Sequence, residues 1–585
     1  MSLARWRAPL LFGLILAVGA ALRFYGVSWD GGQWLHPDER QIYFLALDLG
    51  WPSSLAEAVR PASPLNPGFF AYGSLPICLL RGVAELLALV WPVLRDPDHL
   101  HLAGRPLAAA FDLGTVVLTY RLGSREWGIG KLGNWGVGLV GAGLVAVAVV
   151  HVQSAHFYIV DIILTFFVML VLNLAFDVAG GGGTPAQVML GIATGLTLAT
   201  KVSAAPVLLL AVAAYLIRRR GTTSSDRQFA NMPGHHLLRP IALTFLLAAS
   251  TFVIVQPYAL LDWRTFVSDT LREAQIASGR LDVPYTQQYA GTVPYLYQAW
   301  QLALWGLGLP VGVAAWIGFG ALIGRWLRRG QAADTLLLAW AGPYFALVGL
   351  LHAKPVRYML PLVPVLCLIA AREVGRWGYT RKKVLNIGYL ILGVGVVGYG
   401  VVFVGIYADA HPWIEASEWI YREVGAGSVV AVEEWDTALP LPLEVDGQAR
   451  RIEEYGVQTL RLYDEPDDRA KWQSIAADLA QSDYVVIASR RLYGSIPRLP
   501  ERYPLAARYH ALLFKGDLGF VLAGEFTRGP RWLNPRVPPL PGSAPWVLVP
   551  DESLVVYDRP RALLFENVVR LPADVLFERV TGGEE

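Results

Sequence analysis

Residues 8–24 read APLLFGLILAVGAALRF, and residues 36–39 read HPDE. The first stretch is an apolar run close to the length that a membrane-spanning helix requires, about 20 residues. A cleaved signal peptide is the alternative, but no clear small-residue cleavage site follows where the run reaches Arg23. We therefore expect a retained first span, with HPDE in a polar loop directly after it. The proline and the two acids of HPDE also fit the first turn of a helix, where acids stabilise the dipole.

The composition indicates a polytopic membrane protein with a soluble tail. The 585 residues are 54% hydrophobic and only 16% charged, whereas soluble domains carry about 25% charged residues. The mean hydropathy is +0.41. A net charge of only +2 suggests no nucleic-acid partner. Cys78 and Cys367 both lie in apolar runs and provide neither a zinc-ligand spacing nor a disulfide framework.

Apolar runs and basic loops predict a topology of about eleven spans. One further run, 69–94, carries Arg81 and Glu85 and is predicted to lie on the outer face without crossing. All strongly basic loops then share the side of the N-terminus; a crossing at 69–94 would reverse every later loop. A reading of 186–200 and 202–217 as one broken helix would reverse the later loops too. The predicted spans are 8–24, 105–122, 132–150, 159–178, 186–200, 202–217, 240–257, 299–324, 334–352, 356–371 and 384–406.

This topology predicts two domains in a multi-pass protein of the plasma membrane. Residues 1–407 form a transmembrane module that includes the first outer loop, 25–104, with juxtamembrane helices. Residues 408–585 form an extracytoplasmic α/β domain. The segments 151–161, 258–298 and 352–358 are expected on the same outer face.

Acidic residues of two segments converge on the predicted outer face. Asp38 and Glu39 are neighbours, and adjacent helical residues point about 100° apart, so one acid can act while the other caps or braces. A carboxylate there can serve as general base for an acceptor hydroxyl or amine. Asp161 opens an apolar run, where an unpaired acid is costly and is a functional candidate; an N-cap role is the alternative.

Basic residues reach the same face. Arg105 opens a span, and Lys354, Arg357 and Tyr358 lie between two spans, which suits binding of a lipid phosphate. Interfacial snorkelling and contact with lipid headgroups are the alternatives. Lys201, between two apolar runs, could pair with an acid, contact phosphate or only mark a short loop.

The chain shows no Walker loop, no GxGxxG after a strand, no GxSxG and no HExxH. His151 and His156 are five residues apart, so they do not align on one helical face as a two-histidine metal site. His36 and His156 remain candidate substrate contacts on the outer face.

The order of these motifs resembles the GT-C superfamily of membrane glycosyltransferases, specifically the family 39-like group. That group includes the dolichyl-phosphate-mannose–protein mannosyltransferases and the bacterial aminoarabinose transferases of lipid A. Five elements carry the resemblance across residues 23–370, and none covers the tail. They are His36-Pro37-Asp38-Glu39, Gly104-Arg105-Pro106-Leu107-Ala108, Ser154 to Asp161, Gly195-Leu196-Thr197-Leu198-Ala199-Thr200-Lys201, and Arg357-Tyr358-Met359-Leu360-Pro361-Leu362-Val363-Pro364.

The resemblance implies transfer of a hexosyl or pentosyl group from a polyprenyl-phosphate donor to a lipid, glycan or protein acceptor. Asp38 is implied as catalytic acid/base with Glu39 beside it, and Asp161 as a second site acid. The cations that it implies for the donor phosphate are Arg105, Lys354 and Arg357. Some members use a divalent metal, such as Mg²⁺ or Mn²⁺, for which Asp38 and Asp161 are the candidate ligands. The Pro-Pro-Leu-x-Lys pattern of eukaryotic protein mannosyltransferases is missing from the first loop, so protein mannosylation is not implied.

A transporter or flippase of lipid-linked saccharides is the alternative function, because buried charges among many spans also suit transport. Transporters place such charges near the midplane within inverted repeats, whereas the candidates here gather at one face.

The tail is predicted to alternate helices and strands. Residues 415–424 fit a helix, and the short Val- and Ile-rich runs 428–433 and 483–489 fit strands. Further strands are expected at 546–549, 554–557 and 562–566. The proline-rich stretch 530–545 is predicted to be an extended loop.

Overall fold

The computed structural model describes residues 7–125, 133–219, 235–380, 384–536 and 546–582. The chain divides into two compact units. A helical unit contains residues up to Ser28, Gly32–Ser278 and Pro294–Val404. A C-terminal unit contains the residues from Gly405 onward and two segments from earlier in the chain, Trp29–Gly31 and Gly279–Val293. These two are called the borrowed segments below, because the chain around them belongs to the helical unit. The division at Val404 is close to the predicted boundary at 407.

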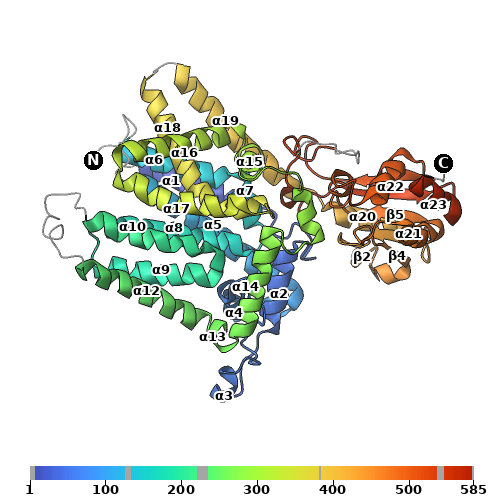
Figure 1. Ribbon diagram of the computed structural model, residues 1–585, viewed down its shortest axis with the longest axis horizontal. Helices are drawn as coiled ribbons and strands as arrows, with labels where there is room; N and C mark the ends of the chain where they lie inside the picture. The colour runs from blue at the N-terminus through green and yellow to red at the C-terminus, as the bar shows by residue number, and fades with distance from the viewer. Residues whose placement is uncertain (1–6, 126–132, 220–234, 381–383, 537–545, 583–585) are drawn as a thin grey trace. The chain divides into compact units, whose positions relative to one another are not determined.

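The helical unit is built from long apolar helices and several shorter ones (Figure 1). The long helices are α1 (Arg7–Phe24), α5 (His101–Gly123), α6 (Gly133–Val147), α8 (Val160–Ala179), α9 (Thr184–Thr200), α10 (Leu208–Arg219), α12 (His235–Val255), α16 (Leu309–Arg329), α17 (Ala332–Leu350), α18 (Val363–Thr380) and α19 (Val384–Val404). The shorter ones are α2 (Pro37–Asp48), α3 (Leu55–Ala58), α4 (Ser74–Ala88), α7 (Val149–Ala155), α13 (Tyr258–Leu261), α14 (Trp263–Ser278) and α15 (Leu296–Gln301). Single turns link them at η2 (Pro92–Arg95), η3 (Pro97–His99), η5 (Val202–Val207), η7 (Leu302–Gly306) and η8 (Val356–Leu362).

Each predicted span coincides with one of these helices or with consecutive ones. Among the described residues, seven helices are long and apolar enough to cross a membrane, or up to eight if the pair α6 and α7, bent by 56°, is one span. This number is lower than about eleven partly because two of the predicted spans are short: the apolar stretch of α1 covers only Ala8–Phe24, and α9 has only 17 residues. The ambiguous run 69–94 forms α4, which has only 15 residues and is not among the candidate spans.

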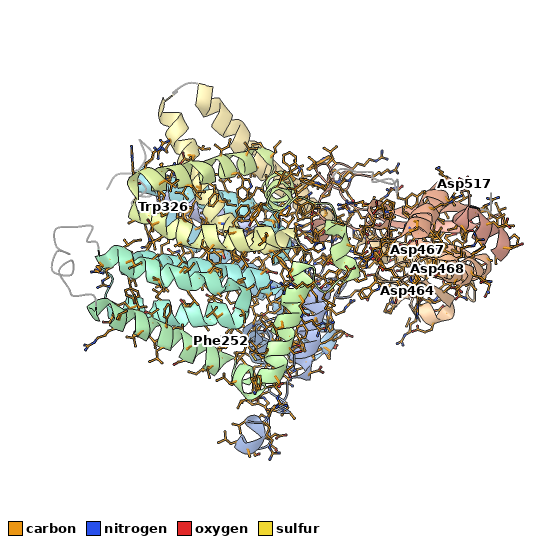
Figure 2. All side chains as sticks on the ribbon, viewed as in Figure 1. Phe252, Trp326, Asp464, Asp467, Asp468 and Asp517 are labelled. Carbon is orange, nitrogen blue, oxygen red and sulfur yellow. The ribbon has the colours of Figure 1, made fainter. Side chains whose placement is uncertain are left out.

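Burial varies across the bundle as expected for a protein surrounded by lipid. Within their spanning windows, α18 is 89% buried and α8 is 78% buried, whereas α12 is only 11% buried. The outward side chains of α12 and α16 are nevertheless apolar; Ile254 is 77% exposed and Leu327 is 71% exposed. Figure 2 shows Phe252 and Trp326 on the same two helices. An exposed apolar belt of this size indicates a membrane-facing surface. The expected polytopic α-helical architecture is therefore confirmed.

The directions of the helices place the candidate site and the basic residues at opposite ends of the bundle. α8 and α10 begin, and α9 and α17 end, at the end crossed by α2 and α14 (Figure 1). The opposite end carries Arg218 and Arg219 of α10 and Arg328 and Arg329 of α16. The predicted basic loops 218–239 and 372–383 lie partly outside the described residues, at 220–234 and 381–383.

The C-terminal unit is an α/β domain around a mixed five-stranded sheet of order β4-β1-β5-β7-β6. β1 is parallel to β4 and β5, and β7 is antiparallel to β5 and β6. The strands are β1 (Val429–Glu433), β4 (Gly456–Leu460), β5 (Tyr484–Ile487), β6 (Phe520–Phe526) and β7 (Ala562–Asn567), with a separate hairpin of β2 (Leu443–Val445) and β3 (Gln448–Arg450). The helices are α20 (Pro412–Glu423), α21 (Arg469–Gln481), α22 (Pro504–Lys515) and α23 (Ala573–Thr581).

The expected helix at 415–424 and the strands at 428–433, 483–489 and 562–566 are confirmed by α20, β1, β5 and β7. The strands predicted at 546–549 and 554–557 are wrong. Asp551 caps a short turn over Glu552–Leu554, and the flanking residues form further turns in which Val555 and Val556 are buried. Residues 537–545 of the predicted loop lie outside the described residues.

Candidate active site

The candidate site is assembled where the ends of α9 and α8 meet α2 and η8. Gly73 fixes one wall, because its amide donates to the carbonyl of Thr200 at 3.0 Å. A Cβ atom at this position would lie 1.8 Å from the carbonyl oxygen of Ala199, so only glycine permits this approach. The contact holds Tyr72 next to the end of α9, where Lys201 follows.

Two carboxylates and two cations form the centre of the site. Arg357 Nη2 lies 2.8 Å from Asp38 Oδ2, and its Nε lies 3.8 Å from Asp161 Oδ2. Lys201 Nζ donates to Asp161 Oδ1 at 2.9 Å. The side chains of Asp38, Arg357 and Lys201 are each 18–19% exposed, whereas Asp161 is 3% exposed. These four residues, the central cluster, come from segments far apart in the sequence, and the convergence expected for Asp38 and Arg357 is observed.

Tyrosines surround the central cluster. Lys201 Nζ lies 4.6 Å from the ring centre of Tyr358, close enough for a cation–π interaction. The phenol of Tyr72 hydrogen-bonds to Asp38. Tyr344 donates to the carbonyl of Tyr358 at 3.0 Å and thereby holds η8 in place. No sequence pattern singles out Tyr72 or Tyr344, because tyrosines at membrane interfaces are common.

The electrostatics keep Asp38 ionised. Burial raises the pKa of this carboxyl, but the charge of Arg357, supported by Lys201 and the Tyr72 hydrogen bond, holds the pKa below its usual value. Burial lowers the pKa of Lys201, but the charge and hydrogen bond of Asp161 together with Tyr358 raise it, so that the net shift is upward and the amine stays charged. The central cluster therefore contains an ionised Asp38 beside Arg357 and a charged Lys201 beside Asp161.

Glu39 and Arg105 form a separate, fully buried pair. Arg105 donates through Nε to Glu39 Oε1 at 3.0 Å and through Nη2 to Oε2 at 2.8 Å. Glu39 Oε1 also accepts from the Tyr43 hydroxyl at 2.8 Å and from the Tyr158 amide at 2.9 Å. Arg105 Nη1 donates to the carbonyl of Val27. The pair joins α2 to α5 and to the segment before α8. Glu39 therefore stabilises the packing of these segments, while Asp38 faces the central cluster.

The remaining predicted residues stand around this centre. His36 caps α2, where its Nδ1 lies 3.5 Å from the amide of Glu39, and burial lowers its pKa to about 3. His156 Nε2 lies 2.9 Å from the carbonyl of Tyr25. Lys354 donates to the carbonyl of His352, and burial lowers its pKa to about 8. A helix therefore begins at Pro37, as its sequence also allowed. The same turn places Asp38 in the central cluster.

An apolar cavity of about 320 Å³ adjoins the central cluster. The polar residues of its lining are Lys201, Ser203, Thr270, Glu273, Tyr344 and Tyr358. Glu273 lies on α14, and burial raises its pKa, with Asp38 adding to the shift and Lys201 opposing it. Sequence reasoning missed Glu273 because α14 carries several exposed charges and resembles a solvated helix. The apolar lining comes from Phe70, Ala71, Val202, Ala274, Ala277, Leu347, Val348 and Leu351.

The carboxylates do not form a metal site. Within the described ranges, no group of three or more His, Cys, Asp and Glu residues is placed to hold a metal ion. Asp38 and Asp161, the candidate ligands, each face a cation at 2.8–2.9 Å. Divalent ions prefer several oxygen ligands, so this set of side chains fits an anionic ligand better than a metal.

The structure is similar to solved membrane proteins over most of its length. One is the archaeal oligosaccharyltransferase AglB from Archaeoglobus fulgidus, in complex with an inhibitory peptide and a dolichol-phosphate: 12% identity, TM-score 0.49, covering 89% of this chain and 73% of that chain. Another is ArnT from Cupriavidus metallidurans bound to undecaprenyl phosphate: 14% identity, TM-score 0.45, covering 96% and 98%. These values are too low to transfer a substrate or the role of a residue. No protein-family model and no curated protein matches the sequence.

Proposed function

We propose that this protein is a membrane glycosyltransferase that takes a sugar from a polyprenyl-phosphate donor on the extracytoplasmic face. The observation that carries this proposal is the central cluster beside an apolar cavity. A lipid-linked donor has an apolar chain and an anionic phosphate, and the site offers apolar walls and two cations next to one another. Lys201 belongs to both the cluster and the cavity lining.

The chemistry follows from these groups. Asp38 accepts the proton of an acceptor hydroxyl or amine, whose electron pair attacks the anomeric carbon of the sugar. The bond between that carbon and the phosphate oxygen breaks, and the phosphate leaves with the bonding electrons. Arg357 and Lys201 stabilise the charge on the departing phosphate. Asp161 orients both cations, which it contacts at 3.8 and 2.9 Å.

We place Arg357 and Lys201 in contact with the donor phosphate, and Arg105 in a bracing role, since Glu39 already takes two of its guanidinium nitrogens. Lys354 and Tyr358 remain proposed donor contacts because they flank Arg357 in the chain. The alternative of a lipid-linked saccharide transporter is less favoured, because the charges of the central cluster lie at the ends of α8 and α9 and not midway along them.

Incubation of the purified protein with radiolabelled polyprenyl-phosphate hexoses and pentoses tests the proposal, because only a transferase consumes donor. We expect Arg357→Ala to lower donor turnover about 10- to 100-fold, the effect of losing a charged hydrogen bond of about 1.5–3 kcal/mol. Arg81→Ala is the matched control, since Arg81 forms an exposed pair with Glu85 on α4, and should leave turnover unchanged. Movement of intact donor across vesicles without consumption would favour a transporter.

The orientation in the membrane gives a second expected result. In a background with Cys78→Ala and Cys367→Ala, an impermeant maleimide added to intact cells should label Ala62→Cys in the first loop and Glu444→Cys in the C-terminal unit. Gln331→Cys, between α16 and α17, should react only after permeabilisation. All three positions are exposed. Labelling of Gln331→Cys from outside would contradict the predicted topology.

A further inference from the structure

The sheet of the C-terminal unit contains a reversal of strand order of the kind at which other α/β domains bind ligands. From β1 the chain continues to β4 on one side, and it then returns through α21 to β5 on the other side of β1. The strand order therefore reverses between β1 and β5. In open α/β sheets, ligands bind outside the carboxyl ends of the strands at such a reversal.

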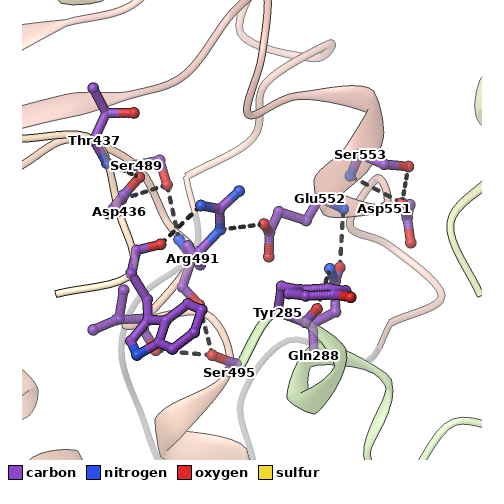
Figure 3. A network of polar contacts seen from close by, with 12 residues as sticks. Tyr285, Gln288, Asp436, Thr437, Ser489, Arg491, Ser495, Asp551, Glu552 and Ser553 are labelled. Carbon is purple, nitrogen blue, oxygen red and sulfur yellow. Dashed lines mark hydrogen bonds and ion pairs between the residues drawn. The ribbon is translucent and has the colours of Figure 1, made fainter. Parts of the chain in front are cut away.

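Polar side chains from three connections meet at this point. Asp436, just beyond β1, accepts from Ser489 Oγ at 2.6 Å and from the amide of Thr437 at 2.9 Å. Arg491, just beyond β5, donates through Nε to Glu552 Oε1 at 2.7 Å. Figure 3 shows Arg491 between Asp436 on one side and Glu552 on the other. Burial raises the pKa of Asp436 to about 6, although Arg491 opposes the shift.

Trp435, next to Asp436, is held in an unfavourable conformation on the surface. Its φ is 70°, which is rare for a bulky residue, and its side chain is 48% exposed. Arg491 Nη1 fixes the Trp435 carbonyl at 2.8 Å. Strained residues that the surroundings hold in place gather at ligand sites. Tyr285, which is 43% exposed, lies on the other side of Arg491 and beside Gln288 (Figure 3).

The chemistry of these groups favours a neutral, hydroxylated ligand. Asp436 and Arg491, with Glu552 beside them, can accept from and donate to several hydroxyl groups at once. An exposed indole offers an apolar face to the C–H face of a sugar ring. A nucleotide or other phosphate is disfavoured, because β1 leads into the hairpin β2–β3 and not into a helix N-terminus, and because Asp436 and Glu552 would repel it.

We propose that the carboxyl ends of β1 and β5 form a saccharide-binding site, in which Trp435 stacks on a sugar ring while Asp436 and Arg491 bind its hydroxyl groups. This site lies wholly within the C-terminal unit, and the inference does not depend on the transferase activity proposed above.

The test uses the full-length protein in detergent, with maltotriose and mannotriose as probes and saturation-transfer NMR and calorimetry as readouts. We expect the wild type to bind at least one of the two. Trp435→Ala and Asp436→Asn should each weaken binding about tenfold or more, and Trp435→Phe should retain most of it. Trp532→Ala is the matched control, because Trp532 is 52% exposed in the same unit and should bind like the wild type.

Thermal unfolding of each variant separates loss of binding from loss of fold, and Trp435→Phe keeps an aromatic ring if Trp435→Ala does not fold. Failure of the folded wild type to bind either trisaccharide at about 10 mM would overturn the saccharide site, as would unchanged binding by Trp435→Ala. Binding of a Ser- and Thr-containing pentapeptide without binding of either trisaccharide would overturn it in favour of a peptide site.

Discussion

Asp38→Asn is expected to reduce sugar transfer by about 10²–10⁴-fold, the usual effect of losing a catalytic acid/base group. The amide has almost the same shape as the carboxylate but cannot accept the acceptor's proton. Asp38 is available as a base because Arg357, with smaller contributions that include Lys201 and the Tyr72 hydrogen bond, offsets burial and keeps the carboxyl ionised, with a pKa below the usual value. Donor turnover by the purified variant, measured with saturating acceptor, gives the effect directly.

The fold should tolerate this change. Asp38 and Arg357 are both partly exposed, and asparagine keeps the shape of the side chain, so this change should destabilise the fold less than the loss of one partner of a fully buried pair. Asp48→Asn is the control, because Asp48 lies at the exposed end of the same helix, α2. Near-normal turnover by a folded Asp38→Asn protein would remove Asp38 from the mechanism and point to Glu273, the carboxylate that lines the cavity.

Arg105→Ala is expected to destabilise the helical unit by about 3–5 kcal/mol, since it leaves Glu39 as a buried charge without its cation. Both side chains are at most 1% exposed. We therefore expect a strong fall in the thermal midpoint and in the yield of folded protein. Replacement of both partners by apolar residues, Glu39→Leu with Arg105→Met, should be milder because no charge is left buried.

Arg81→Ala again provides the comparison, because the Arg81–Glu85 pair is exposed and its loss should cost about 1 kcal/mol or less. A folded, stable Arg105→Ala protein that had lost only donor binding would restore Arg105 to the phosphate contact that the family resemblance implies.

The sequence was sufficient to predict the helical architecture. It was not sufficient to predict which of the neighbouring acids, Asp38 or Glu39, lies in the central cluster. A long apolar run is a direct sign of a segment buried in lipid, so each predicted span coincides with one helix or with consecutive helices. The sequence could not tell that Asp38 and Glu39 diverge, because that depends on which partner each side chain meets. Glu39 forms an ion pair with Arg105, 66 positions further along the chain, whereas Asp38 forms one with Arg357. Long-range pairing of this kind leaves no local pattern.

The C-terminal unit shows the same limit for strands. The run around Val555 and Val556 is as apolar as β1, yet it is buried in turns, because Pro550 and Asp551 start a capped turn. The sequence pattern does not predict β6, although this strand pairs with β7 along most of its length, because Gly524 interrupts the pattern at an irregularity in the register. In both segments tertiary packing, and not the local strand propensity of the residues, determines the structure that forms.

The two borrowed segments mean that the C-terminal unit cannot be separated from the rest as one continuous fragment. A polypeptide beginning at Gly405 would lack Gln287, whose amide donates to the buried Tyr503 at 3.0 Å. It would also lack the carbonyls of Gln288 and Ala290, each of which accepts from Arg498 at 2.7 Å. The buried indole of Trp29, 5.5 Å from the ring of His411, would be missing as well. This domain reaches its final form only after both loops of the membrane module have been synthesised, so its folding is tied to that of the helices that precede it.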